Sequence, residues 1–254
     1  KVINLLSNKN YKIIVNCGGS GFIGGNLIKV LEKKYKITII DRKKLTINTN
    51  SLSFYKSNIS NAKLINQILI KKNIKIVIHL AAKINASASV FKRRLYYLNN
   101  FMYSKKLFEI CKKNNIKKFI FASSAAVYGN KKNIFYEKDL KKPINPYGKY
   151  KLDFEKYLLK NRGQTQIGIL RFFNVVGNYP KEKLKNNNLP IISKIEKIIL
   201  NNSRSKLKIF GNNHNTKDGT ASRDFIHVKD IALICSKVIN LLSNKNYKII
   251  VNCG

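Results

Sequence analysis

Short apolar runs alternate with longer segments of helical period along most of the chain. The runs are rich in Ile and Val and bounded by polar residues, which is typical of buried parallel strands. They cover residues 13–15, 37–40, 74–80, 119–121 and 167–170. The segments between them have the length of helices and cover residues 23–34, 62–72, 96–114 and 147–161. Strand, helix and strand in repeated order predict an α/β fold with a doubly wound parallel sheet.

The alternation ends after Gly177. The chain then becomes polar, with asparagine clusters at 186–188 and 212–215, which predicts a smaller, loop-rich lobe. We therefore expect one domain over residues 11–177 and a partial substrate-binding lobe over 178–254. Within that lobe, residues 222–240 are expected to pack back on the first domain, and residues 1–10 receive no role.

The two ends of the chain carry an exact repeat. Residues 1–18 and residues 237–254 both read KVINLLSNKNYKIIVNCG. Solenoid repeats are tandem and diverged, so two identical copies at opposite ends do not indicate a solenoid. Our hypothesis is a reading frame misjoined at the shared glycine. We therefore expect an incomplete copy of a longer protein that continues beyond Gly254.

The chain of 254 residues has 50 Lys and Arg against 12 Asp and Glu, a formal net charge of +38. Lysine is accompanied throughout by asparagine and isoleucine, residue types that share AT-rich codons. The basic residues are spread along the chain without interleaved aromatics, so no specific nucleic-acid partner is predicted. No apolar run reaches the ~18 residues of a membrane span, and Lys1 begins no signal peptide. The sequence thus predicts a cytoplasmic protein with reduced cysteines and no metal site.

A glycine-rich turn follows the first predicted strand. Gly18, Gly21 and Gly24 are spaced as G-x-x-G-x-x-G where a helix is predicted to begin. Glycines allow a tight turn and the close approach of a pyrophosphate to the amino end of a helix. Asp41 ends the next strand, where a carboxylate can accept hydrogen bonds from ribose hydroxyls, which favours NAD. Arg42 leaves the alternative of NADP open, because it could contact a 2′-phosphate.

Candidate catalytic residues lie at two other predicted elements. Tyr147 and Lys151 are four residues apart at the start of a predicted helix, so they share one face. A free tyrosine titrates near ~10, and we expect the positive charges of Lys151 and the nicotinamide to lower that pKa. Ser124 follows the strand at 119–121, at the edge where doubly wound sheets bind ligands. It is expected to pass a proton between a substrate hydroxyl and Tyr147.

The motifs together resemble the extended short-chain dehydrogenases, and among them the UDP-glucose (UDP-galactose) 4-epimerases. The resemblance runs from about Lys12 to Gly254. It rests on GGSGFIGG (18–25), IHLAA (78–82), FIFASSAAVYG (119–129), NPYGKYK (145–151), RFFNVVG (171–177), KIFGN (208–212) and DGTASRDFIHVKDIA (218–232).

This resemblance implies a Rossmann-like domain and two sets of binding residues. It implies that NAD is held by Gly18, Gly21, Phe22, Ile23, Gly24, Asp41, Asn58, Ile59, Leu80, Ala81, Ala82, Asn99, Lys151 and Phe173. It implies that the UDP-sugar is held by Ser124, Tyr147, Asn174, Asn188, Leu189, Ile209, Phe210 and Arg223. Two departures from the family pattern, Cys17 for a threonine and Asn58 for an aspartate, would weaken NAD binding.

The resemblance implies NAD-dependent epimerisation at C4 of a UDP-hexose through a transient 4-keto intermediate. A 4,6-dehydratase would need an acid and a base beside the serine, where this chain has Ala125 and Ala126. A uronate epimerase or decarboxylase stays open, as does a catalytically inactive basic binding protein of the same fold. A homodimer is left open as well.

Overall fold

The computed structural model describes residues 21–43, 52–130, 134–177, 191–200, 206–207 and 214–254, and the backbone of residues 12–16. Its centre is a seven-stranded sheet in which all neighbouring strands are parallel. The strand order is β3 (Leu52–Lys56), β2 (Lys36–Asp41), β1 (Lys12–Asn16), β4 (Ile76–His79), β5 (Lys118–Ser124), β6 (Gln166–Phe172) and β9 (Lys248–Cys253). The expected α/β fold with a doubly wound parallel sheet is confirmed.

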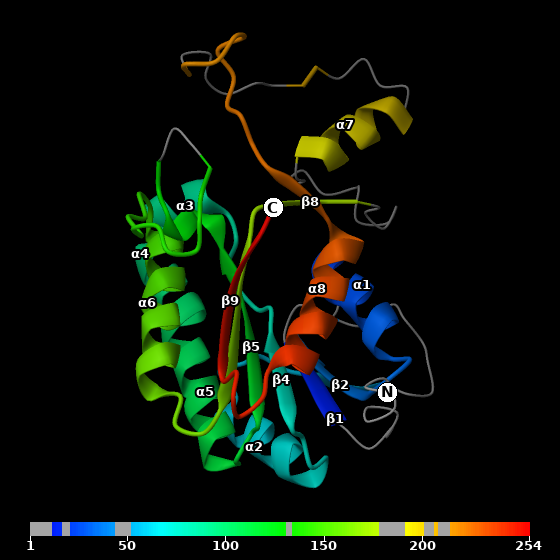
Figure 1. Ribbon diagram of the computed structural model, residues 1–254. Coiled ribbons are helices and arrows are strands. Elements are labelled where there is room, and N and C mark those ends of the chain that lie inside the picture. The colour runs from blue at the N-terminus through cyan, green and yellow to red at the C-terminus, as the bar shows by residue number, and fades with distance from the viewer. Residues whose placement is uncertain are drawn as a thin grey trace.

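Helices cover both faces of this sheet (Figure 1). One face carries α1 (Phe22–Leu31) and α8 (Val228–Leu241), and the other carries α2 (Ala62–Lys71), α5 (Tyr103–Lys113) and α6 (Pro146–Asn161). Alternate strand residues enter the two cores: Ile120 packs with α1 and α8, whereas Phe119 and Phe121 pack with α5 and α6. Burial on both faces explains why the strands read as continuous apolar runs.

Several short elements surround the carboxyl end of the sheet. They are α3 (Ala86–Phe91), α4 (Arg93–Tyr96), the π-helical turn η2 (Tyr97–Met102) and the 3₁₀ turn η3 (Ala125–Val127). The single helix expected over residues 96–114 is therefore divided between the end of α4, η2 and α5. A separate pair of parallel strands, β7 (Asn174–Val176) and β8 (Phe225–His227), and helix α7 (Ile191–Leu200) complete the described elements.

The two copies of the terminal repeat supply two strands of one sheet. Residues 12–16 form the inner strand β1 between β2 and β4, whereas the identical residues 248–252 belong to β9, which is at the edge of the sheet among the described strands and pairs with β6. The sequence analysis did not predict β3, β9 or α8. The boundary at residue 177 stays a prediction, and the structure places both α8 and β9, from the range 178–254, on the main sheet.

Candidate active site

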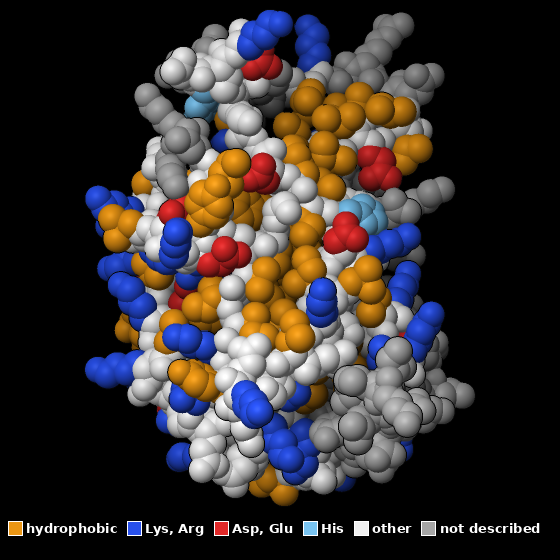
Figure 2. Space-filling view, in the orientation of Figure 1, with side chains coloured by type: hydrophobic (Ala, Val, Ile, Leu, Met, Phe, Trp, Pro, Cys, Tyr) orange, Lys and Arg blue, Asp and Glu red, His pale blue; other side chains and the backbone are white. Residues whose placement is uncertain are grey.

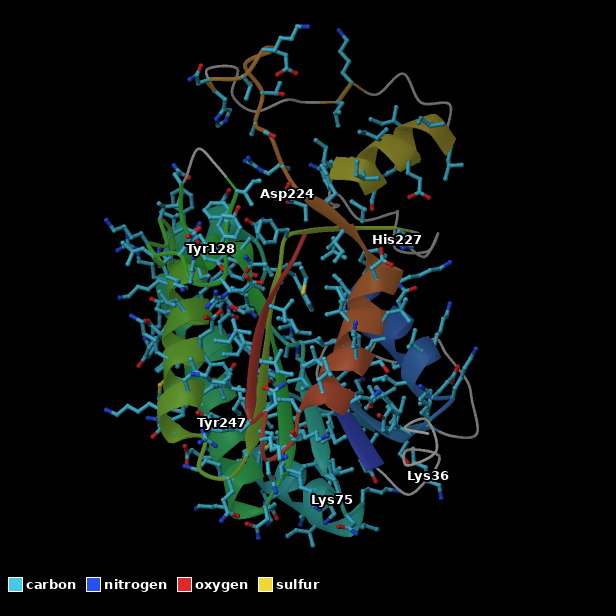
Figure 3. All side chains as sticks on the ribbon, in the orientation of Figure 1. Lys36, Lys75, Tyr128, Asp224, His227 and Tyr247 are labelled. Atoms are coloured by element: carbon cyan, nitrogen blue, oxygen red, sulfur yellow. The ribbon has the colours of Figure 1, made fainter. Side chains whose placement is uncertain are left out.

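The candidate catalytic residues lie at the carboxyl edge of the sheet. Figure 3 shows Lys36 and Lys75, at the starts of β2 and β4, at one end of the molecule, and Tyr128, Asp224 and His227 near the other. Ser124 is the last residue of β5, and its hydroxyl accepts a hydrogen bond from the Ala126 amide at 3.2 Å. The parallel arrangement therefore directs Ser124 toward the edge where open sheets bind ligands.

Helix α6 begins with a well-defined cap that fixes the backbone of Tyr147. The Asn145 side chain accepts a hydrogen bond from the Gly148 amide at 2.8 Å, and Pro146 occupies the first turn. The Tyr147 amide donates to the hydroxyl of Ser89, on α3, at 3.1 Å. The amides of Tyr147 and Gly148 thus both donate to side chains. Because one acceptor is the N-cap Asn145 and the other is Ser89 on α3, the start of α6 is fixed by its own cap and by a second helix.

Gly148 lets α6 approach the turn that follows Ser124. A Cβ atom at Gly148 would lie 2.3 Å from the carbonyl oxygen of Ala126, in η3. No side chain fits in that space, so the glycine permits a contact that brings the first turn of α6 to the end of β5. The sequence analysis missed this role, although the glycine directly follows Tyr147 in the motif.

Tyr147 and Ser124 meet as expected. Ser124 is close enough to the Tyr147 phenol to act on its pKa, and both residues are partly exposed, so a ligand can reach them. Burial of the phenol raises the pKa of Tyr147, the neighbouring Ser124 hydroxyl opposes this rise, and Tyr96 adds to it. The expected lowering of this pKa by Lys151 together with the nicotinamide stays a prediction; among the protein groups alone, burial is the largest effect.

Lys151 lies one helical turn further along the same face and is buried. Its Nζ donates to the carbonyl oxygen of Ala122 at 2.6 Å and lies 4.7 Å from the ring centre of Phe121 and 6.0 Å from that of Tyr147. The pairing of β4 with β5 ends at His79 and Phe121, so the carbonyl that Lys151 contacts belongs to the first β5 residue after the last β4 pair. Burial lowers the pKa of Lys151 to about 7, against the opposing charge of Glu155.

The amino end of α1 opens at the same edge and suits a diphosphate. Its N-cap is Gly21, which has no capping side chain, and no acidic residue lies in its first turn, where Phe22, Ile23 and Gly24 follow. Backbone amides and the helix dipole favour an anion at such an end. Asp41 ends the neighbouring strand β2, is 9% exposed and accepts a hydrogen bond from the Lys43 amide at 3.0 Å. Gly18 lies outside the described residues.

The other residues expected near NAD follow the strands β3 and β4. Asn58 accepts a hydrogen bond from the Ser60 amide, and Ile59 is buried. Leu80, Ala81 and Ala82 directly follow β4 and are partly buried. The Asn99 side chain, on η2, donates to the Leu95 carbonyl of the preceding α4. The adjacent Asn100 is buried, and its side chain accepts a hydrogen bond from the Lys83 amide and donates one to the Lys83 carbonyl. Asn100, which the sequence analysis did not select, thus fixes the segment after β4.

A family model described as the NAD dependent epimerase/dehydratase family matches residues 14–254. The chain belongs to this family. The resemblance seen in the motifs is thereby confirmed, as is NAD as the cofactor. The glycine-capped helix and the carboxylate at the end of β2 are the features of this structure that fit that cofactor.

Relatives and solved structures agree with this assignment. The bifunctional UDP-glucose 4-epimerase and UDP-xylose 4-epimerase 1 of Pisum sativum is 32% identical over 247 residues, which cover 87% of this chain and 69% of that protein. A UDP-N-acetylglucosamine 4-epimerase structure from Methanobrevibacter ruminantium is 34% identical with a TM-score of 0.78, covering 96% of this chain and 76% of that one. The Bifidobacterium longum UDP-glucose 4-epimerase, solved with NAD+ and UDP, is 29% identical with a TM-score of 0.81, covering 95% and 78%.

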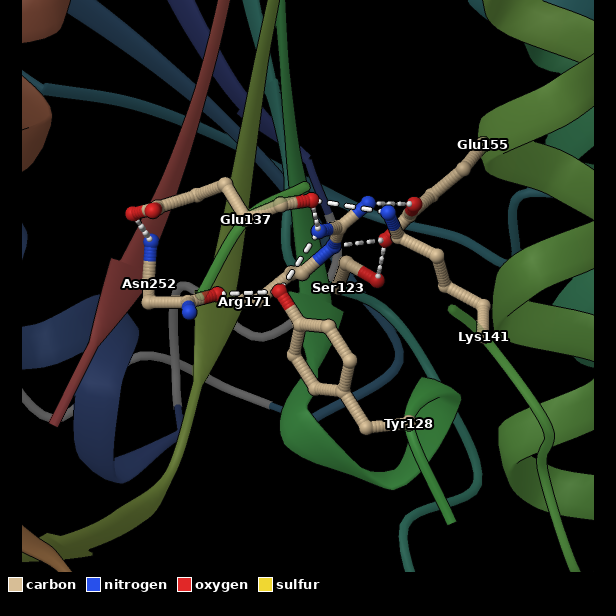
Figure 4. Close-up of polar contacts among 7 residues, drawn as sticks. All are labelled: Ser123, Tyr128, Glu137, Lys141, Glu155, Arg171 and Asn252. Atoms are coloured by element: carbon tan, nitrogen blue, oxygen red, sulfur yellow. Dashed lines mark hydrogen bonds and ion pairs between the residues drawn. The ribbon is translucent and has the colours of Figure 1, made fainter. Parts of the chain in front are cut away.

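In this epimerase/dehydratase family member a buried network of polar side chains joins β5, β6 and α6 next to the candidate site (Figure 4). Arg171, on β6, forms a two-point ion pair with Glu155, on α6, at 3.1 and 2.7 Å. Glu155 also accepts a hydrogen bond from Ser123 at 2.5 Å, and Arg171 donates to the Tyr128 hydroxyl at 2.7 Å. The sequence analysis missed this network. An acidic residue four positions after Lys151 was the available signal.

The network also connects to β9. The Tyr128 hydroxyl donates to the side-chain oxygen of Asn252 at 2.7 Å, and the backbone amide of Asn252 donates to the Glu137 carboxylate at 2.8 Å. Glu137 in turn accepts at its backbone carbonyl from Arg171 and from Lys141. Asn252, from the second copy of the repeat, therefore takes part in the polar network beside α6.

The residues expected to hold the UDP-sugar are only partly brought together. Phe173, which was expected near NAD rather than the UDP-sugar, follows β6, and its ring lies 6.3 Å from that of Phe135. Asn174 is exposed and its side chain donates to the Asp224 carbonyl at 2.8 Å, which places it beside the exposed Arg223. The remaining four residues lie outside the described residues: Asn188, Leu189, Ile209 and Phe210.

No group of three or more His, Cys, Asp or Glu side chains suited to a metal ion occurs in the described part of the chain. Likewise, none of the described helices is long and apolar enough to cross a membrane.

Proposed function

We propose that this enzyme epimerises C4 of a UDP-hexose, with UDP-glucose and UDP-galactose as the two forms. The observation that carries the proposal is the proximity of the Tyr147 and Ser124 hydroxyls at the carboxyl edge of the sheet, with the buried Lys151 Nζ 6.0 Å from the Tyr147 ring centre. A hydroxyl pair beside a buried cation is a proton-transfer site for an alcohol. The names of the relatives from pea and Bifidobacterium longum support the choice of a UDP-hexose.

In this proposal each side chain has a separate task. Ser124 orients the substrate hydroxyl and passes its proton to Tyr147, which returns it when the opposite configuration forms. Lys151, fixed to the Ala122 carbonyl, supplies positive charge that favours the phenolate. NAD, when bound, supplies the hydride acceptor and donor. We assign NAD binding to the glycine-rich turn and Asp41, with Asn58, Ile59, Leu80, Ala81, Ala82, Asn99, Lys151 and Phe173.

The substrate assignments are also proposals. We assign the UDP-sugar to Asn174, Asn188, Leu189, Ile209, Phe210 and Arg223, besides Ser124 and Tyr147. The guanidinium of Arg223 suits a diphosphate because its donors match the phosphate oxygens. Ala125 and Ala126 form η3 directly after Ser124 and have no group that transfers a proton. This favours epimerisation over the elimination of water.

A test compares two neighbouring tyrosines of one helix. Tyr147→Phe is expected to lower kcat for the conversion of UDP-galactose to UDP-glucose by about 10²- to 10⁴-fold, the range for the loss of a general acid or base. Tyr150→Phe is the matched control, since Tyr150 lies on the same helix and contacts the ring of Tyr97. It should retain wild-type kcat. Equal rates for both variants, or accumulation of reduced nicotinamide during turnover, would contradict the proposal.

The partner and location assignments remain proposals too. We place the protein in the cytoplasm, supported by the buried free thiols of Cys111, Cys235 and Cys253. Figure 2 shows Lys and Arg side chains dispersed over the visible face rather than gathered in one stripe, which supports the absence of a specific nucleic-acid partner. A homodimer is supported by exposed apolar side chains on α3 and α4, such as Phe91 and Leu95. Analytical ultracentrifugation tests it.

A further inference from the structure

One face of α6 makes three successive contacts with the end of β5. Tyr147, Lys151 and Glu155 are spaced by one helical turn, and they meet Ser124, the carbonyl of Ala122 and the hydroxyl of Ser123 respectively. Two of these helical residues belong to the proposed catalytic set. The third, Glu155, has no assigned task, although it is 2% exposed and carries a charge.

The carboxylate of Glu155 forms an ion pair with one cation and lies one helical turn from a second. Arg171 holds it from β6 through Nε at 3.1 Å and Nη2 at 2.7 Å, and the two side chains are 3% and 2% exposed. Lys151 lies one turn earlier on the helix and experiences its negative charge. Two buried basic side chains, one in direct contact and one a helical turn away, thus depend on one buried carboxylate. Without the carboxylate, the basic groups would be buried without a compensating negative charge, which is costly in a medium of low polarity.

Other titratable and charged groups surround Lys151. On α6 these are Tyr147 and Glu155, and on β4 the imidazole of His79. Arg171 on β6 pairs with Glu155, while Tyr128, Glu137 and Lys141 contact Arg171 or its partners. Tyr96, on α4, acts on Tyr147. Of these groups Glu155 is the one whose negative charge acts on Lys151.

We propose that Glu155, held in place by Arg171, is a positioning residue for the reaction: its carboxylate keeps the Lys151 ammonium charged at the Ala122 carbonyl. This inference rests on the proposed function, in which Lys151 must carry its charge to favour the Tyr147 phenolate. It adds a group that contacts neither substrate nor cofactor and acts only through Lys151.

The first test is the pH profile of kcat in the NAD-loaded full chain carrying Glu155→Gln. Gln keeps the shape of the side chain and removes its charge. The alkaline limb of the profile should move down by about one pH unit, the low end of the effect of a nearby opposite charge. One unit corresponds to about a tenfold lower kcat on that limb. Glu109→Gln is the matched control, because it removes a carboxylate from a partly exposed site on α5. Its alkaline limb should coincide with that of the wild type.

A second variant covers the case in which Glu155→Gln does not fold. Removing one partner of a buried ion pair is strongly destabilising, whereas replacing both with apolar residues is often neutral. The double variant Glu155→Met with Arg171→Met removes the carboxylate together with its second cation. We expect its alkaline limb between those of wild type and Glu155→Gln. An alkaline limb that stays at the wild-type pH in a folded variant would overturn the proposal and leave the pair a purely structural role.

A readout without catalysis separates this inference from the proposed function. In ¹³C-lysine-labelled protein the Lys151 signal, assigned by its loss in Lys151→Met, should titrate at lower pH in Glu155→Gln than in wild type. If the wild type fails to interconvert UDP-hexoses while this shift occurs, the proposed function fails and the electrostatic role of Glu155 stands. If catalysis is present and the Lys151 titration is unchanged, the positioning role is refuted alone.

Discussion

Replacing Gly148 with alanine tests whether close packing sets the geometry of the active site. The added Cβ would lie 2.3 Å from the Ala126 carbonyl oxygen, 2.9 Å from its carbon and 3.1 Å from the Pro143 Cβ. Ordinary carbon–oxygen contacts begin near ~3.3 Å. Because the nearest atoms belong to the backbone, no side-chain rotation relieves the overlap. The first turn of α6 must move from η3 by about 1 Å.

The same movement separates Tyr147 from Ser124. A misplacement of about 1 Å can lower the rate about 10²-fold, so we expect kcat of Gly148→Ala to fall by about that factor. The free energy of unfolding should fall only modestly, because two effects oppose each other. Overpacking costs about 1–3 kcal/mol, while alanine gains up to about 1 kcal/mol over glycine in a helix. Initial rates of UDP-glucose formation and urea unfolding measure the two effects on the same preparation.

Gly168→Ala serves as the matched control on β6. Its Cβ would meet Ile120 Cδ1 at 2.8 Å and Val238 Cγ1 at 2.9 Å, which are side-chain ends in the core between the sheet and α8. This variant should lose stability with kcat nearly unchanged. The reasoning would be refuted if Gly148→Ala kept wild-type kcat, or if both variants lost activity only in proportion to their loss of folded protein.

Three further predictions concern single side chains. Ser89→Ala leaves the Tyr147 amide without its acceptor and should cost about 1–3 kcal/mol in urea unfolding, with reduced kcat. The pKa of Lys151 is about 7 in the folded protein and 10.5 in the reference state, so unfolding takes up a proton between these values and wild-type stability rises with pH there. Lys151→Met should therefore have the higher Tm at pH 7, with the gap closing toward pH 10.5. The pKa of His79 is about 3 against 6.5, so wild-type stability should fall by about 4 kcal/mol on acidification from pH 6.5 to 3. His79→Leu should keep its free energy of unfolding over this pH range as far as His79 is concerned. If urea unfolding shows the same decrease in His79→Leu and in the wild type, the prediction is wrong.

Local pattern was sufficient for the inner part of the fold. The strands around residues 13–15, 37–40 and 119–121 were predicted because each reads as an uninterrupted apolar run, and the last two are buried on both faces. The proximity of Tyr147 and Ser124 followed from similar reasoning. A side chain on the first turn of a helix and one at the carboxyl end of a parallel strand lie at the same edge of the sheet.

The terminal repeat shows where local pattern is insufficient. The segment KIIVN is an inner strand in its first copy and an edge strand in its second, so its position depends on which neighbours the rest of the chain supplies. Strand β3 was missed for a related reason. Its residues are only partly buried at the other edge of the sheet, and their sequence LSFYK lacks the run of Ile and Val.

By itself the sequence determined the α/β class, because this depends on periodicity, and short spacing was enough to select the glycine-rich turn, Ser124, Tyr147 and Lys151 as candidate site residues. Only the tertiary structure decided that Glu155 pairs with Arg171 and that Gly148 contacts Ala126. Those contacts join residues on different elements, whose approach is set by the packing of α6 on β5 and β6. No local rule relates positions that become neighbours only when a helix docks on a sheet.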